Sequence, residues 1–332
     1  MAHRSTLHIA AISALVSLLT LSSQTASAQI LDVRELQPSQ IAGLDRARTV
    51  FLLTGGILEE HGPFLPSYAD GYQTEFVATK VAEAIAARPG WTVLRFPAIP
   101  LGVFPASEIG AKFSFPGSYG VRSTTLRAVY MDLVTDLGEA GFKWGFLLNL
   151  HGAPTHNQML DQVAQYFSDT YGGRVTHLTG LASVAGAVPR DLFSADQRKT
   201  EGFSVHADAD EHSRVLFLRP DLVSPSITNA PPVVGKDFAD LVALAKKDDW
   251  TGYFGTPAIA TAAAGARAMN AIAQAAIDAA LKVLDGAPDA SFPRVAGLLA
   301  NDPDVQRLLR TSVEHEQQIE RRQNDWLGRN RR

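Results

Sequence analysis

The sequence contains no cysteine among its 332 residues. Disulfide bonds, a thiolate nucleophile, a cysteine-ligated iron–sulfur cluster and a cysteine-type zinc site are therefore all excluded. The chain also has no large excess of one charge, because 30 Lys and Arg residues are nearly balanced by 34 Asp and Glu residues. The net charge of -4 gives no indication of a basic surface for nucleic acid. The chain is 46% hydrophobic and can bury a large core. Its chemistry must come chiefly from hydroxyl, carboxylate, amine and imidazole groups.

The N-terminus has the pattern of a secretory signal peptide. Met1–Arg4 carries a positive charge, and Leu7–Leu21 is mostly apolar. Ala26–Ala28 has the small-x-small pattern that precedes a cleavage site. The alternative is a membrane anchor, but the apolar run is shorter than the roughly 20 residues that span a bilayer. No later segment is long and apolar enough to hold the chain in a membrane. We therefore predict a signal peptide at residues 1–28 and a mature protein that is secreted or periplasmic.

Strand-like and helix-like segments alternate along the mature chain. Short apolar runs rich in β-branched and aromatic residues predict strands, and segments with apolar residues at helical spacing predict helices. This alternation predicts an α/β fold, in which a mostly parallel sheet is covered by helices on both faces as three layers. The predicted strands are Thr49–Leu53, Trp91–Phe96, Trp144–Leu148 and Arg174–Leu178, and the predicted helices are Asp70–Ala87, Ser123–Ala140, Asn157–Tyr171 and Ala260–Leu284.

Two changes in composition suggest how the chain is organised. The Pro- and Ser-rich segment Ser224–Gly235 predicts an irregular excursion rather than a domain boundary. Beyond Pro288 the sequence becomes charged and helical in propensity. We predict one catalytic domain at residues 29–286 and a charged helical extension at 287–332. A solvated helix is the favoured interpretation of that extension, and a binding element is the alternative.

Three clusters of imidazole and carboxylate groups recur along the chain. The first, at Glu59–His61, follows the first predicted strand, and Asp70 is expected to cap the next helix. The second, at Asn149–His151, follows the Trp144–Leu148 strand. The third is His206–Ser213, in which acidic residues lie between two histidines. Each cluster alone could be a solvated loop or a local cap. Because ligands gather beyond the carboxyl ends of parallel strands, three clusters together predict a metal site.

The motifs resemble those of the creatininase (creatinine amidohydrolase) family. The segments ILEEHGPFLPSYAD, SEIGAKFSFPGSYG, NLHGAPTHN, HADADEHS and GYFGTPAIATAAAGARA occur in the order of the family's motifs, over about Ile30 to Leu284. The resemblance implies a creatininase-like fold and a two-metal centre. It places Glu59 and His151 on one ion, His61 and Glu211 on the other, and Asp70 as the bridging carboxylate.

The same resemblance implies a reaction and a partner. His206 falls on the family's catalytic histidine. Two divalent ions, Zn or Mn with Fe as another option, held about 3.5 to 4 Å apart would share a water and lower its pKa toward neutrality. His206 would protonate the leaving nitrogen, and Glu60 and Glu108 are weaker alternatives. The predicted substrate is a small cyclic or linear amide, and the predicted assembly is a homo-oligomer, by resemblance a hexamer.

Several positions depart from the family pattern. Ala153 stands where creatininase has a further ligand glutamate, for which His156 or Asn157 could compensate. The aromatic residue that normally precedes the catalytic histidine is missing, so Phe203 or Tyr119 would have to stack on a flat substrate. Phe64 and Ile57 replace a frequent His and Ser. These changes favour an amide other than creatinine. A metal or solute binder without turnover and a two-metal phosphoesterase are the competing hypotheses.

Overall fold

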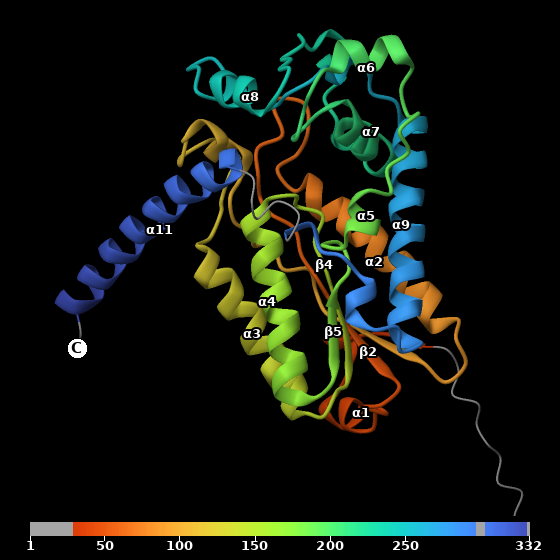
Figure 1. Ribbon diagram of the computed structural model, residues 1–332. Coiled ribbons are helices and arrows are strands. Elements are labelled where there is room, and N and C mark those ends of the chain that lie inside the picture. Colours follow the sequence, from red (N-terminus) through yellow and green to blue (C-terminus); the bar gives the residue numbers. More distant parts are fainter. Residues whose placement is uncertain (1–28, 297–302, 331–332) are drawn as a thin grey trace, which may run out of the picture.

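A computed structural model describes residues 29–296 and 303–330, so the predicted signal peptide lies outside the described residues. At its centre is a parallel five-stranded sheet in the order β1-β3-β2-β4-β5. Helices cover both faces of this sheet (Figure 1), which confirms the predicted fold class. The strands are β1 (Gln29–Asp32), β2 (Thr49–Thr54), β3 (Thr92–Arg95), β4 (Trp144–Leu148) and β5 (Arg174–His177).

Side chains along the central strands point alternately to the two faces of the sheet, and the core is therefore divided into two apolar layers. In β2, Val50 and Leu52 face one layer, whereas Phe51 and Leu53 face the other. Successive strand side chains point to opposite faces, so a strand covered on both faces must be apolar throughout. This explains why every residue of β2 is buried. β2 pairs with β3 on one side and β4 on the other, and Thr54 lies opposite Leu148 at the carboxyl ends.

Each face of the sheet is covered by a pair of long helices. α2 (Ala69–Ala86) and α9 (Ala262–Leu284) pack on the Val50 and Leu52 face, and α3 (Ser123–Glu139) and α4 (Pro154–Tyr171) pack on the other. Small residues let α9 approach its neighbours closely: a Cβ on Gly265 would lie 1.8 Å from the Ser213 carbonyl oxygen. Any larger side chain there would push away the helix that contains Ser213.

Shorter elements gather above the carboxyl ends of the strands. Figure 1 shows α6 (Ala195–Glu201), α7 (Ala209–Leu218) and α8 (Phe238–Ala245) at this end of the molecule. The predicted excursion at 224–235 holds one short 3-10 helix, η4 (Pro225–Asn229). The remaining elements are α1 (Pro38–Ala42), α5 (Ala182–Ala185), η1 (Val33–Glu35), η2 (Ala106–Gly110), η3 (Pro220–Leu222), η5 (Pro257–Ile259) and η6 (Asp289–Ser291).

Two features near the helix ends differ from the sequence prediction. Asp70 does not cap α2: the N-cap is Tyr68, and Asp70 lies inside the first helical turn, where its carboxylate is free to point into the molecule. The C-terminal helix α11 (Pro303–Arg329) is not solvated from its start, because its first half contacts η2 and the first residue of α3. No helix among the described residues is long and apolar enough to cross a membrane.

Candidate metal centre

The loops that follow β2 and β4 emerge side by side because these two strands are paired. The first carries Glu59 and His61, and the second carries His151. Asp70 joins them from the first turn of α2. A close approach makes this possible, since a Cβ on Gly56 would lie 2.6 Å from the Cα of Gly71. Parallel strand ends and a glycine contact thus bring the first two predicted clusters together.

The third cluster arrives from α7 and the residues before it. His206 and Glu211 lie against the first cluster, so the structure brings together all six residues that were singled out from the sequence. Within this cluster, Ala207 has a φ of 48°, a left-handed conformation that costs energy for a residue with a Cβ. Its N–H donates to Glu211 Oε2 at 2.8 Å. The strained turn therefore fixes both His206 and Glu211.

Their side chains form two groups that share one carboxylate. In the first group, His151 Nδ1 lies 3.0 Å from Glu59 Oε2 and 3.2 Å from Asp70 Oδ2. In the second, His61 Nε2 lies 3.7 Å from Asp70 Oδ1 and 3.4 Å from Glu211 Oε1. The two oxygens of Asp70 thus face different groups, as a bridging carboxylate would.

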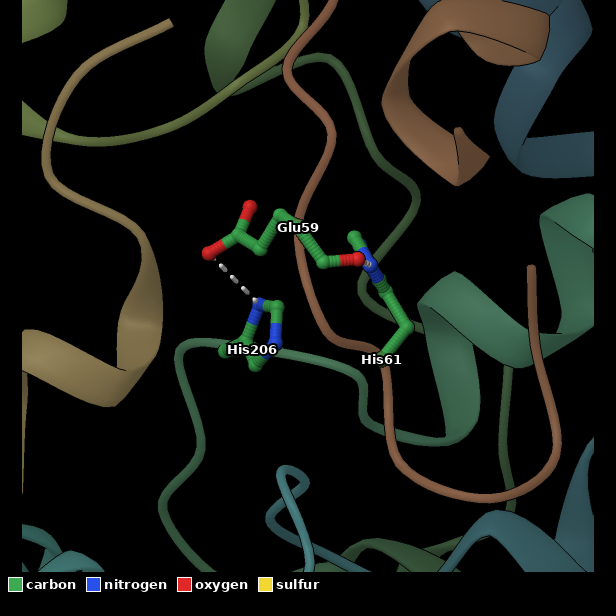
Figure 2. A group of neighbouring side chains, drawn as sticks. All are labelled: Glu59, His61 and His206. Carbon is green, nitrogen blue, oxygen red and sulfur yellow. Dashed lines mark hydrogen bonds and ion pairs between the residues drawn. The ribbon is translucent and has the colours of Figure 1, made fainter. Parts of the chain in front are cut away.

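A third group links Glu59, His61 and His206. Figure 2 shows the Glu59 carboxylate directed toward His206 and away from His61, with its Oε1 3.7 Å from His206 Nδ1. The two histidine rings lie 4.6 Å apart between centroids. His206 therefore faces the same point as the two groups around Asp70, and any molecule bound there would meet its Nδ1.

Backbone carbonyls determine which nitrogen each imidazole presents. His61 Nδ1 lies 3.1 Å from the Glu59 carbonyl, His151 Nε2 lies 2.9 Å from the Val103 carbonyl, and His206 Nε2 lies 2.6 Å from the Glu60 carbonyl. Only a protonated nitrogen can donate to a carbonyl, so the other nitrogen of each ring is the one that faces the cluster, and it offers a lone pair whenever the ring is neutral. Carbonyl contacts of this kind orient metal-ligating histidines.

The donor atoms fit a pair of divalent ions. Glu59 Oε2, His61 Nε2 and Asp70 Oδ2 are buried and make no hydrogen bond of good geometry within the described part of the chain. Buried polar atoms are normally satisfied, so unsatisfied ones that converge on a point indicate a missing partner. Carboxylate oxygen and imidazole nitrogen are ligands that suit Zn²⁺ and Mn²⁺.

The ion pairs within the cluster determine the pKa values of its histidines and of Glu211. Burial alone would lower the pKa of His61, but Glu211 and Asp70 outweigh it and hold that pKa well above 6.5. His151 behaves in the same way beside Glu59 and Asp70. Burial would raise the pKa of Glu211, yet His61 lowers it to about 2. The Glu211 carboxylate is therefore ionised near neutral pH, as a metal-ligating carboxylate must be.

His206 differs from the other two histidines. Burial is the main influence on its pKa and lowers it below 6.5, with Glu59 opposing and the nearby His61 reinforcing the shift. Its imidazole is thus neutral at pH 7 and its Nδ1 can accept a proton. This property separates His206 from the ligand set, although all three rings share one cluster.

The residues considered as replacements for the ligand missing at Ala153 have other contacts. Asn157 Nδ2 donates to the carbonyls of His151 and Ala153, so it supports the backbone of the loop. His156 is fully buried, and its ring stands edge-on to His151 with centroids 5.1 Å apart. It belongs to none of the three groups found among the described residues. Ala153 lines the open side of the site.

A cavity of about 440 Å³ opens above this cluster. Glu59, Asp70, His151, His206 and Glu211 form part of its lining, and a second part of the lining is apolar. Of the two aromatic side chains considered for stacking, Phe203 lines the cavity, while Tyr119 is 66% exposed and does not. Phe64 packs against His212 and Tyr253 outside the cavity.

Several lining residues carry no signal in the sequence. Arg214 reaches the cavity from α7, and Val305, Leu308 and Leu309 reach it from α11. Arg214 lies one residue beyond the HADADEHS motif, which was the only local hint of its position. The three apolar residues belong to the C-terminal extension, which looked like a solvated helix.

Comparisons with known proteins agree with this geometry. A sequence profile of the family described as "Creatininase: Creatinine amidohydrolase" matches residues 34–280. The chain belongs to the creatininase family. The resemblance seen in the motifs is thereby confirmed. A search of curated proteins gave no match.

Solved creatininase structures share the fold at low identity. A crystal structure of creatinine amidohydrolase is 23% identical, covers 80% of this chain and 100% of its own, and superposes with a TM-score of 0.57. A putative creatinine amidohydrolase from Bacteroides fragilis is 22% identical, covers 76% and 96%, and has a TM-score of 0.55. A manganese form of creatininase is 20% identical, covers 78% and 99%, and has a TM-score of 0.54. The family match ends before α11 begins.

Proposed function

We propose that this creatininase-family protein is a metal-dependent amidohydrolase that cleaves the C–N bond of a small cyclic or linear amide. The observation that carries the proposal is the pair of buried imidazole and carboxylate groups that share Asp70, hold three donor atoms without a hydrogen bond, and lie beneath a cavity. Family membership supports hydrolysis as the reaction. Ala153 and the missing aromatic residue before His206 favour an amide other than creatinine.

The proposed ligands are Glu59 and His151 for one ion, His61 and Glu211 for the other, and Asp70 for both. Zn or Mn is the proposed metal, on the basis of the donor atoms; solved creatininases are described in a manganese form and a Zn-Zn form. When bound, such ions would polarise the amide carbonyl and activate a water near pH 7.

The chain's own residues would move the proton. His206 is held by the Glu60 carbonyl, so its neutral Nδ1 faces the cluster. We propose that Nδ1 accepts a proton from the attacking water and passes it to the amide nitrogen, which leaves as an amine or ammonia. The buried setting favours the second step, because the lowered pKa of His206 makes its protonated form a better proton donor than an ordinary imidazolium.

Asp70→Asn tests the ligand assignment. The variant keeps the shape of the side chain but loses its charge, so we expect at least one ion per chain to be lost and hydrolysis to stop. Elemental analysis of the purified protein would be combined with ammonia or amine release from a panel of cyclic and linear amides. Asp132→Asn, an exposed change on α3, is the matched control. Two ions retained by Asp70→Asn would contradict the assignment.

The same panel tests the competing hypothesis. A wild-type protein that holds two ions but releases neither ammonia nor amine from any amide would be a binder without turnover. The position of His206 argues against this outcome, because metal binding by the proposed ligands does not require a neutral imidazole beside them.

We also propose export and self-association. The pattern of residues 1–28 supports a secreted or periplasmic location, and removal at Gln29 would take away no described element, since β1 begins there. Mass spectrometry of the mature N-terminus would test the cleavage. The family resemblance supports a homo-oligomer, which sedimentation analysis would test.

A further inference from the structure

The C-terminal helix α11 forms one wall of the cavity above the metal cluster. Val305, Leu308 and Leu309 from its first two turns line the space, and they lie outside the family match. Other apolar side chains, from distant parts of the chain, also line the cavity. They are Phe104, Ile109, Phe203, Val205 and Phe238.

Specific contacts hold α11 in this position. Ser312 Oγ donates to Glu108 on η2, and His315 stacks on Phe113 with ring centroids 4.0 Å apart. Leu308 also packs against a buried apolar cluster that includes Trp250 and Phe254. A frayed, solvated helix would make none of these contacts, so the first half of α11 is a built part of the cavity.

A second set of contacts fixes the direction of the helix. Glu316 accepts hydrogen bonds from the backbone N–H and the hydroxyl of Ser123, at 2.8 and 2.6 Å. Glu320 pairs with Arg122 at 3.3 Å. Beyond this point, residues 321–330 are exposed, and Figure 1 shows the helix leaving the body of the molecule. The anchoring contacts therefore begin at the part of the helix that reaches the cavity and continue along it to Glu320.

We propose that α11 builds an apolar subsite and that the substrate carries an apolar group next to its scissile amide. The inference rests on the proposed function, and it names a substrate class: amides with an aliphatic or aromatic substituent of several carbons. The amide would lie on the metal cluster, and the substituent would lie against Val305, Leu308 and Leu309. Burying each methylene there removes apolar surface from water, which favours longer substituents.

Straight-chain hydroxamates, from acetohydroxamate to octanohydroxamate, provide a direct probe. Their head group binds divalent ions, so titration calorimetry with the metal-loaded full-length protein reports the subsite without any turnover. We expect affinity to rise about fourfold for each added methylene until the wall is covered. In Leu308→Ser this rise should flatten, while the affinity for acetohydroxamate stays within about twofold of wild type.

Two further variants serve as a control and as a second test of the subsite. Val313→Ser changes an apolar residue on the same helix that is 43% exposed and does not line the cavity, so it should bind the whole series as wild type does. Leu308→Phe keeps α11 apolar but narrows the subsite. It should weaken binding of the longest hydroxamates at least tenfold and leave the affinity for acetohydroxamate unchanged. This result would show that Leu308 lines the subsite, rather than that its substitution undocks the helix.

The outcomes distinguish the inference from the function on which it rests. A wild-type protein that hydrolyses short amides but binds all hydroxamates equally would overturn the subsite alone. The same holds if Leu308→Ser keeps the full dependence on chain length. A protein that binds longer hydroxamates through α11 but hydrolyses no amide would retain the subsite and lose the amidohydrolase function. Failure to bind any hydroxamate would overturn the subsite, and it would overturn the function as well only if no amide were hydrolysed.

Discussion

His206 lies in the same cluster as the proposed metal ligands, yet we propose a different role for it. Its Nε2 is fixed by the Glu60 carbonyl, and burial keeps the ring neutral near pH 7. Substitution of a proton-transferring group typically costs 10² to 10⁴ in rate. We therefore expect His206→Ala to retain two ions per chain and to lose activity by roughly that factor.

The pH profile gives this prediction a second readout. Wild-type kcat/KM should fall as the pH drops below 6.5, because protonation of His206 removes its acceptor lone pair. The residual activity of His206→Ala should lack this acidic limb. Profiles of equal shape in the two proteins, or loss of metal from the variant, would contradict a proton-transfer role for His206.

Glu108 is a buried acid at the contact between η2 and α11. Burial is the main cause that raises its pKa, to about 7, and Ser312 opposes the shift. The folded protein therefore holds a proton on Glu108 that the unfolded chain has already released above about pH 4.5. As a result, folding stability should decline as the pH rises from about 4.5 to 7 and should then level off.

Glu108→Gln should remove this decline. The amide keeps a hydrogen-bonding partner for Ser312 but cannot ionise, so near pH 8 the metal-free variant should be more stable than wild type, by at most a few kcal/mol. Urea unfolding at several pH values would measure the difference. Ser123→Ala, which removes another α11 contact without a buried acid, should leave the wild-type slope in place.

At the scale of elements, a polar bridge joins α2 to α7 behind the metal cluster. Gln73 Nε2 donates to Glu211 Oε1 at 3.2 Å, and Arg214 donates to Gln73 Oε1 at 3.2 Å. Arg214 is in turn paired with Asp210. Glu211 is thus oriented by residues that do not themselves belong to the three metal-ligand groups.

Loss of this bridge should weaken one ion selectively. In Gln73→Leu, Glu211 loses a donor while the fold keeps a side chain of similar size, so we expect about 10- to 100-fold weaker binding of one of the two ions. Competition with a fluorescent chelator would measure both affinities. Gln274→Leu, an exposed change on α9, is the control. An equal loss for both ions would indicate a general structural effect instead.

The sequence predicts the long elements well because their signals are local. β2, β4 and α3 lie within a residue or so of their predicted bounds, since each is an apolar run or a helical pattern with clear ends. β1 gave no such signal, because this four-residue edge strand contains Gln29 and Asp32 and is partly exposed. Asp70 looked like a helix cap, yet its buried environment comes from the clusters around it.

The site could be anticipated only in part for the same reason. Its acidic floor comes from three motifs whose histidines and carboxylates, taken together, already predict a metal site from the sequence. Its apolar wall comes from Leu308 and Leu309, which line the same cavity as Phe203 and Phe238 although they lie far from them in the sequence. Leucines at helical spacing look alike whether they face a cavity, a core or another protein. Only the folded chain shows which of these they contact.

At the scale of the whole molecule, the metal cluster links α2, α7 and the ends of two strands, so metal binding should stabilise the fold. An ion present at 1,000 times its Kd contributes about 4 kcal/mol. For a chain of this length, the melting temperature should rise by on the order of 10 °C when metal is restored to chelated protein. Differential scanning calorimetry of the loaded and chelated forms would measure this rise.

This stabilisation should grow with pH, and the direction follows from the histidines. Without metal, His61 and His151 have pKa values well above 6.5, so their protonated forms stabilise the cluster and that contribution disappears as the pH rises through those values. Metal replaces these protons, and protons compete with it less at higher pH. The gap in melting temperature should therefore be wider at pH 9 than at pH 6, and clearly smaller in Asp70→Ala than in wild type. An equal gap at both pH values, or an unchanged gap in Asp70→Ala, would mean that the ions stabilise the protein from somewhere else.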